Sequence, residues 1–305
     1  MLGDILRTAR ENKGFKIKEV SDGIIHPSQL SKIENTEVMP SFENFLKLLS
    51  KLNLSFEEFS YLAKENPAFQ RRVLDQDVTE ALRQKDTDKM NRMMERLKKF
   101  QREAPENHLY SQQMMQLLEG IAALQNKDQE EARLIVKEIV DYLNRVEPWY
   151  HYELKLFNDI FFYFEYETVL ALGREAQRAI ELRYDFFRND PLPRKILYNL
   201  SVAALHHEDY MRAFKFSSDV IGLPLSTENL YTLTNAKIVN QLASFKLENG
   251  LFDLEQLQQL LAIYDTLGIS HVAQQFRKTA QNLGVQVNDN KNGNSPDYSQ
   301  GSQKN

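Results

Sequence analysis

The stretch "SDGIIHPSQLSKIENTE", residues 21–37, decides the fold of the N-terminal part of the chain. Gly23 ends one short helix, and Pro27 suits the first turn of the next because its missing N–H would have no partner there. In that second helix Leu30 and Ile33 form an apolar side, while the other residues are mostly small and polar. Two short helices joined by a tight break, the second apolar on one side, predict a helix-turn-helix.

The polar side of this second helix carries side chains that can recognise base edges in the major groove. Gln pairs with adenine, Lys reaches guanine, and Ser serves either. The predicted base contacts are Ser28, Gln29, Ser31 and Lys32. Nearby cations suit phosphates, and the predicted phosphate contacts are Arg7, Arg10, Lys16 and Lys18. Glu34 would repel phosphate, so we expect it to pair inside the domain.

Residues 1–64 as a whole predict five short helices. The first has its apolar residues at helical spacing, from Leu2 to Ala9, and Gly14 suits its C-terminal end. Ser41 is placed to cap a helix that follows Pro40. "SFEE", residues 55–58, has the spacing of a capping box, in which two side chains satisfy each other's backbone at a helix start.

Composition limits the function classes. The chain has 305 residues, a net charge of −5 and no cysteine, which excludes disulfides and cysteine metal sites. We expect a cytoplasmic protein, because residues 1–10 do not resemble a signal peptide and no apolar run is long enough to span a membrane. Phosphate-loop, dinucleotide-binding and hydrolase motifs are absent, so the sequence predicts neither an enzyme nor a cofactor or metal site.

From residue 71 to 284 the sequence repeats loosely, after a predicted linker at residues 65–70. Polar turns that lead into amphipathic helices place Asp86, Asp128, Tyr166 and Asp209 at matching positions, 42, 38 and 43 residues apart. A period near 40 with two helices per unit predicts an α-solenoid resembling tetratricopeptide repeats. The predicted fold is therefore all-α. Residues 285–305 are rich in Asn, Ser and Gly and are predicted to be disordered.

The strings "GIIHPSQLSKIEN" and "SFENFLKLLSKLNLSFEEF" resemble the Cro/repressor-like helix-turn-helix and, more narrowly, the Rgg family of transcription regulators. The resemblance covers the N-terminal domain strongly and the repeats in architecture. It implies a homodimer that reads two half-sites of promoter DNA, and repeats that bind a short secreted signalling peptide. Lys32 stands where an Arg is common in the family, which puts a bidentate base contact at that position in doubt.

If an extended peptide lies along the first helices of the repeats, its backbone needs hydrogen-bond partners. Asn offers one acceptor and two donors, and three Asn residues recur 41 and 36 residues apart. We predict that they clamp the peptide backbone, while aromatic residues form pockets and cations bind a carboxylate. Caps on buried carbonyls between repeats are the alternative role for the asparagines. The predicted peptide contacts are Asn158, Asn199, Asn235, Phe162, Tyr198, Tyr231, Arg194 and Lys237.

A second function stays open at this point. Residues 1–66 hold nine Lys or Arg and ten Asp or Glu, so charge alone does not indicate DNA binding. The chain could instead be an adaptor that binds a protein partner through its repeats and uses the N-terminal domain for docking. Salt dependence distinguishes the two, because DNA binding releases counterions and weakens steeply as salt rises.

Overall fold

The computed structural model describes residues 2–35, 38–187, 190–224 and 229–287. Within these ranges every regular element is a helix, which confirms the predicted all-α fold. None of the described helices is both long and apolar enough to cross a bilayer. Residues 285–287 are described, and the rest of the predicted tail lies outside the described residues. The chain divides between Glu138 and Ile139 into two compact units, each described by itself.

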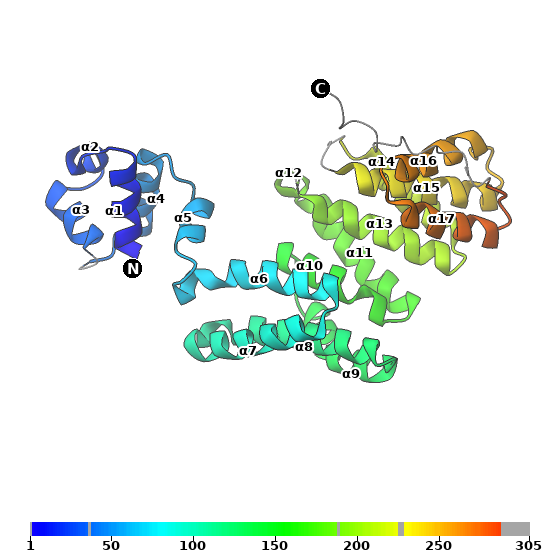
Figure 1. Cartoon of the computed structure of the whole chain (residues 1–305), viewed down its shortest axis with the longest axis horizontal. Helices are drawn as coiled ribbons and strands as arrows, with labels where there is room; N and C mark the ends of the chain where they lie inside the picture. The colour runs from blue at the N-terminus through cyan, green and yellow to red at the C-terminus, as the bar shows by residue number, and fades with distance from the viewer. Residues whose placement is uncertain (1, 36–37, 188–189, 225–228, 288–305) are drawn as a thin grey trace, which may run out of the picture. The chain divides into compact units, whose positions relative to one another are not determined.

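The first unit begins with five short helices around one apolar core (Figure 1). These are α1 Leu2–Asn12, α2 Ile17–Ser21, α3 Pro27–Glu34, α4 Phe42–Lys51 and α5 Phe56–Leu62. Leu6, Leu30, Leu48 and Phe59 are almost completely buried in this core. The number and order of the helices agree with the sequence prediction.

The predicted helix ends are confirmed in detail. Gly14 and Gly23 both have a left-handed backbone, with φ of 74° and 73°. The Ser41 hydroxyl accepts from the Asn44 N–H at 3.3 Å. At α5 the Ser55 hydroxyl accepts from the Glu58 N–H at 3.0 Å, and the Glu58 carboxylate accepts from the Ser55 N–H at 2.8 Å. Local hydrogen bonding therefore sets the ends of these helices.

Longer helices follow the five short ones in the first unit. They are α6 Pro67–Gln84, α7 Thr87–Glu103 and α8 His108–Gln125, with a 3₁₀ turn at Pro105–Asn107, and α9 Gln129–Leu143 runs through the division between the units. Residues 67–70 of the predicted linker are helical, because Pro67 suits a first helical turn. Phe69 packs against the Phe59 ring, with 5.7 Å between centroids, and so anchors the start of α6 to the N-terminal core.

In the second unit most helices pack on the next one along the chain (Figure 1). They are α10 His151–Ile160, α11 Tyr166–Leu182, α12 Tyr184–Phe187, α13 Pro191–His206, α14 Tyr210–Gly222, α15 Leu230–Leu247, α16 Leu254–Thr266 and α17 Ser270–Asn282, with a 3₁₀ turn at Phe161–Tyr163. Gly173 of α11 lies against Leu200 of α13, so close that a Cβ would stand 2.9 Å from a Leu200 methyl. A small residue at this position therefore permits the close packing of neighbouring repeats.

The loose repeat corresponds to repeated helix starts. The carboxylates of Asp86, Asp128 and Asp209 accept from backbone N–H groups three residues later, at 3.0, 2.9 and 3.1 Å. Tyr166 departs from this pattern, because it is the first residue of α11 and donates its hydroxyl to Asp209 at 3.1 Å. Four residues after each position lies a buried side chain, and these are Met90, Ala132, Leu170 and Ala213.

Candidate nucleic-acid interface and asparagine row

Helix α3 has one buried side and one exposed side. Leu30 and Ile33 are buried in the N-terminal core. Of the predicted base contacts, Ser28, Gln29 and Lys32 are exposed and Ser31 is half-buried. Because the core holds α3 by its apolar side, these polar groups are presented outward from a fixed helix. Their contacts with bases remain a prediction.

The N-terminus of α3 is capped by a residue that the sequence prediction missed. The ring Nδ1 of His26 accepts from the Ser28 backbone N–H at 3.3 Å and lies 2.7 Å from the Ser28 hydroxyl oxygen. Pro27 occupies the first helical position. That proline was the available signal, because a Pro at the first helical position makes the preceding residue the cap. His is not among the preferred caps, which explains why composition alone did not indicate it.

The prediction that Arg10 contacts phosphate is wrong. Its guanidinium is buried and donates to both carboxylate oxygens of Glu34, at 2.7 and 2.8 Å, and to the Phe15 carbonyl at 2.9 Å. The hydrogen bonds that Arg10 donates to Glu34 raise the pKa of Arg10, although burial opposes this. Arg10 is therefore a structural cation that joins α1 to α3. The expectation that Glu34 pairs inside the domain is confirmed.

The other predicted phosphate contacts are exposed. Arg7 lies 3.5 Å from the Glu11 carboxylate, in a pair that is half in solvent on both sides. Such pairs are weak and exchange readily for another anion. Lys16 and Lys18 are exposed at the start of α2. These three cations keep their predicted role as candidates for phosphates.

We call Asn158, Asn199 and Asn235 the asparagine row, since they lie on the first helices α10, α13 and α15. The Asn199 amide donates to the Asn158 carbonyl oxygen at 3.0 Å, and the Asn158 amide donates to Asp159 at 2.9 Å. The structure thus joins the first two members across neighbouring repeats. Asn158 is 6% exposed and Asn199 is half-buried, so Asn199 is the more accessible of the two.

The third member of the row and a predicted cation have internal partners. Asn235 is 1% exposed and accepts a hydrogen bond from the Tyr264 hydroxyl on α16, so it holds helices together and is not accessible to a peptide. This is a structural role between helices, although the partner is a tyrosine hydroxyl and not the buried carbonyl of the alternative role. Arg194 is buried and donates to the Pro224 carbonyl, so it is not accessible to a peptide carboxylate. Both predicted peptide contacts are corrected, because a neighbouring helix or loop supplies a partner that spacing does not reveal.

The predicted aromatic contacts differ in exposure. Phe162 is 49% exposed and stacks on Tyr163 with 4.5 Å between ring centroids. Tyr231 is 56% exposed, with its ring edge-on to Tyr264. Burial raises the pKa of Tyr198, which packs on a small apolar cluster. Phe162 and Tyr231 therefore offer apolar surface, Tyr198 offers little, and Lys237 is half-buried on α15.

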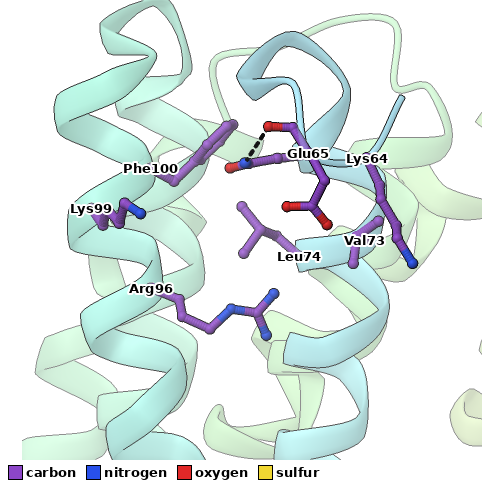
Figure 2. Close-up of a pocket in the computed structure, with 8 residues that line it drawn as sticks. Lys64, Glu65, Val73, Leu74, Arg96, Lys99 and Phe100 are labelled. Atoms are coloured by element: carbon purple, nitrogen blue, oxygen red, sulfur yellow. Dashed lines mark hydrogen bonds between the residues drawn. The ribbon is translucent and has the colours of Figure 1, made fainter. Parts of the chain in front are cut away.

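The first unit also contains a hollow of about 350 Å³ between α6, α7 and the residues that follow α5 (Figure 2). It is lined by Lys64, Glu65, Gln70, Val73, Leu74, Arg96, Lys99 and Phe100. Figure 2 shows the Glu65 carboxylate over Leu74, between the side chains of Arg96 and Lys64. Arg96 pairs with Asp77 at 2.7 Å and Lys99 with Glu103 at 3.7 Å, so these two cations have carboxylate partners already. We assign no anion site to this hollow.

Comparison with known protein families gives two matches. Residues 6–59 match the helix-turn-helix family model. Residues 135–278 match the model of the C-terminal domain of the HTH-type transcriptional regulator Rgg. The matched ranges together cover more than half of the chain and lie in the order that the sequence predicts.

Solved structures of similar fold agree with these matches. The Streptococcus dysgalactiae SHP pheromone receptor Rgg2 matches with a TM-score of 0.70 and 20% identity, over 92% of this chain and 98% of its own. A putative transcriptional regulator from Listeria monocytogenes matches with a TM-score of 0.73 and 17% identity, over 93% and 99%. Bacillus thuringiensis PlcR, solved with the peptide PapR7 and DNA, matches with 0.67 and 17%, over 90% and 98%. With its helix-turn-helix and its Rgg C-terminal domain, this chain belongs to the Rgg family of transcriptional regulators.

Proposed function

We propose that the chain is a cytoplasmic homodimer that reads two half-sites of promoter DNA. When its repeats bind a short signalling peptide, the homodimer changes the transcription of that promoter. The observation that carries the DNA half is the outward polar side of α3, with Ser28, Gln29 and Lys32 exposed on a helix fixed by a buried core. A helix in the major groove needs this arrangement. PlcR, solved with the peptide PapR7, and the pheromone receptor Rgg2 make a peptide the preferred effector class.

The DNA half is tested by fluorescence anisotropy of the full-length protein on the duplex directly upstream of its own gene. Gln29→Ala, Lys32→Ala removes two predicted base contacts that are each worth about 1–3 kcal/mol. Gln275→Ala, Lys278→Ala on α17 is the matched control, because it removes the same residue types at the same spacing from an exposed face. We expect the first variant to lose at least roughly tenfold in affinity and the control to bind as the unaltered chain.

Salt titration in the same experiment separates DNA reading from the adaptor function. A reader that neutralises several phosphates loses affinity steeply between low and moderate salt, because counterions are released. An adaptor whose N-terminal domain docks on protein binds DNA weakly and without sequence preference. The adaptor function would be favoured if both double variants and the unaltered chain bind DNA with equal affinity. This would have to hold on the upstream duplex and on fragmented genomic DNA.

The peptide half rests on the joined amides of Asn158 and Asn199. Their hydrogen bond fixes both side chains and uses the Asn199 amide nitrogen as its donor, so the Asn199 carbonyl oxygen takes no part in it. That oxygen is an acceptor suited to a peptide N–H. A peptide shifts regulation only to the extent that it binds one conformation of the regulator more tightly than another. The exposed rings of Phe162 and Tyr231 would supply apolar contacts.

Replacing both joined asparagines tests the clamp. Asn158→Ala, Asn199→Ala is expected to abolish the response of a promoter reporter to the peptide fraction of conditioned medium while basal DNA affinity stays unchanged. Asn144→Ala, Asn282→Ala is the control, since both side chains are exposed in the same unit. A normal response in the Asn158→Ala, Asn199→Ala variant would exclude the clamp.

A further inference from the structure

The cap of α3 determines how Ser28 presents its hydroxyl to DNA. We infer that His26 orients the Ser28 hydroxyl as a hydrogen-bond acceptor, so that Ser28 selects adenine or cytosine at the base it contacts. This inference rests on the proposed function, in which α3 lies in the major groove. His26 is then a positioning residue that acts through Ser28, and nothing in the family matches assigns it a role.

The protonation of the ring nitrogen follows from the backbone. The Ser28 N–H can only donate, and it is directed at His26 Nδ1 at 3.3 Å. A nitrogen that accepts a hydrogen bond carries a lone pair and no proton, so the ring proton of neutral His26 lies on Nε2. The tautomer of His26 is therefore set by the helix start itself.

The direction of the side-chain hydrogen bond follows from the tautomer. The Ser28 hydroxyl oxygen lies 2.7 Å from the same Nδ1, which has no proton to give. The hydroxyl must therefore donate its only proton to His26. What remains on the exposed side of Ser28 is oxygen lone pairs, so Ser28 can accept from DNA but cannot donate to it.

The major groove offers few donors for such an acceptor. Adenine presents its N6 amino group and cytosine its N4 amino group, whereas guanine and thymine present only acceptors and the thymine methyl group. An acceptor-only Ser28 is matched by adenine or cytosine and opposes the oxygens of guanine and thymine. Without His26 the hydroxyl could rotate and serve any of these bases.

Selection of binding sites from a random-sequence duplex library with the full-length protein tests this. The unaltered chain is expected to enrich adenine or cytosine over guanine and thymine, by roughly three- to tenfold, at one position of each half-site. Ser28→Ala identifies that position by removing the preference there. His26→Gly removes the acceptor but keeps the helix start, because Gly caps nearly as well as polar residues. It is expected to remove the same preference and leave the positions read through Gln29 unchanged.

His26→Asp provides the rescue. Its carboxylate accepts but does not donate, so the Ser28 hydroxyl stays oriented and the base preference is expected to return. The overall affinity for DNA is expected to fall, because the carboxylate is repelled by nearby phosphates. A preference for guanine or thymine at the Ser28 position, or one that His26→Gly leaves intact, would overturn the inference. If the unaltered chain enriches no sequence at all, the proposed DNA function fails and the inference falls with it.

Discussion

Two surfaces were predicted to bind ligands, the polar side of α3 and the asparagine row of α10, α13 and α15. They differ in how many of the predicted contact residues are accessible to a ligand. On α3 three of the four predicted side chains are exposed. In the row, Asn235 is buried against Tyr264, and Asn158 and Asn199 bind each other. A short helix on a small core has no neighbour on its outer side, whereas a helix between repeats has neighbours that can satisfy its polar groups.

The same difference separates two arginines of α1. Arg7 and Arg10 are three residues apart, yet Arg7 is exposed and Arg10 is paired with Glu34 inside the core. The carboxylate that satisfies Arg10 lies 24 positions away in the sequence. We therefore expect substitutions at the buried pair to act on stability and substitutions at Arg7 to act on DNA affinity.

The largest expected effect is that of Glu34→Ala. It leaves the Arg10 cation buried without its main partner, and breaking a buried pair in this way costs about 3–5 kcal/mol. The measurement is the free energy of unfolding, with hydrogen exchange of α1 and α3 amides to locate the loss. Glu11→Ala is the control, because its carboxylate is 55% exposed and pairs of that kind contribute about 1 kcal/mol or less. A cost of Glu34→Ala below that of the control would contradict the buried pair.

The next effect distinguishes members of the asparagine row. Asn235→Ala leaves the Tyr264 hydroxyl without its closest acceptor in a buried site, which costs about 1–3 kcal/mol. Asn199→Ala removes a half-buried amide and is expected to cost less in stability but to weaken the response to peptide. Thermal unfolding and the promoter reporter, measured on both variants, test this. Equal stability losses would show that Asn199 is as structural as Asn235.

Whether the sequence predicts the role of a polar residue depends on how far away in the sequence its hydrogen-bond partner lies. Ser55 and Glu58 form a capping box because their spacing suffices, and the position after Pro40 fixes Ser41 as a cap. The burial of Met90 and Ala132 follows from helical spacing as well. The partners of Arg10, Arg194 and Asn235 come from other helices or loops, and no local pattern encodes them. His26 lies between these cases, since Pro27 marked its position but not its chemistry.

A smaller effect is expected at Lys16 and Lys18. Both are exposed, so Lys16→Ala, Lys18→Ala leaves the core intact. If both contact phosphates, the slope of log affinity against log salt falls by about 2, and the loss is the same on specific and unrelated DNA. Anisotropy over a salt series measures this. An unchanged slope would remove both residues from the interface, and a loss confined to the specific site would indicate a base contact instead.

The smallest effect concerns an ion pair of the second unit that can be compared with the buried pair of the first. Arg277 of α17 donates to Asp265 of α16, whose side chain is 29% exposed. The hydrogen bond from Arg277 lowers the pKa of Asp265 below its ordinary 3.8, although burial opposes it. A carboxyl whose pKa is lower in the folded state stabilises the fold above the unfolded-state pKa, and loses that contribution as pH falls through the folded-state pKa.

Asp265→Asn should therefore reduce stability by about 1 kcal/mol or less at pH 7, because partly exposed pairs are weak. As pH falls below the ordinary 3.8 and through the lowered folded-state pKa of Asp265, the difference between the unaltered chain and the variant should shrink, since the protonated carboxyl is neutral like the asparagine amide. Urea unfolding of both chains over this pH range measures the difference. A difference that stays constant with pH would mean that Asp265 acts through its shape and neutral hydrogen bonds. A stability loss of Asp265→Asn as large as that of Glu34→Ala would mean that the Arg277–Asp265 and Arg10–Glu34 pairs are equally shielded from water. The ion pairs of the two units would then not differ in strength.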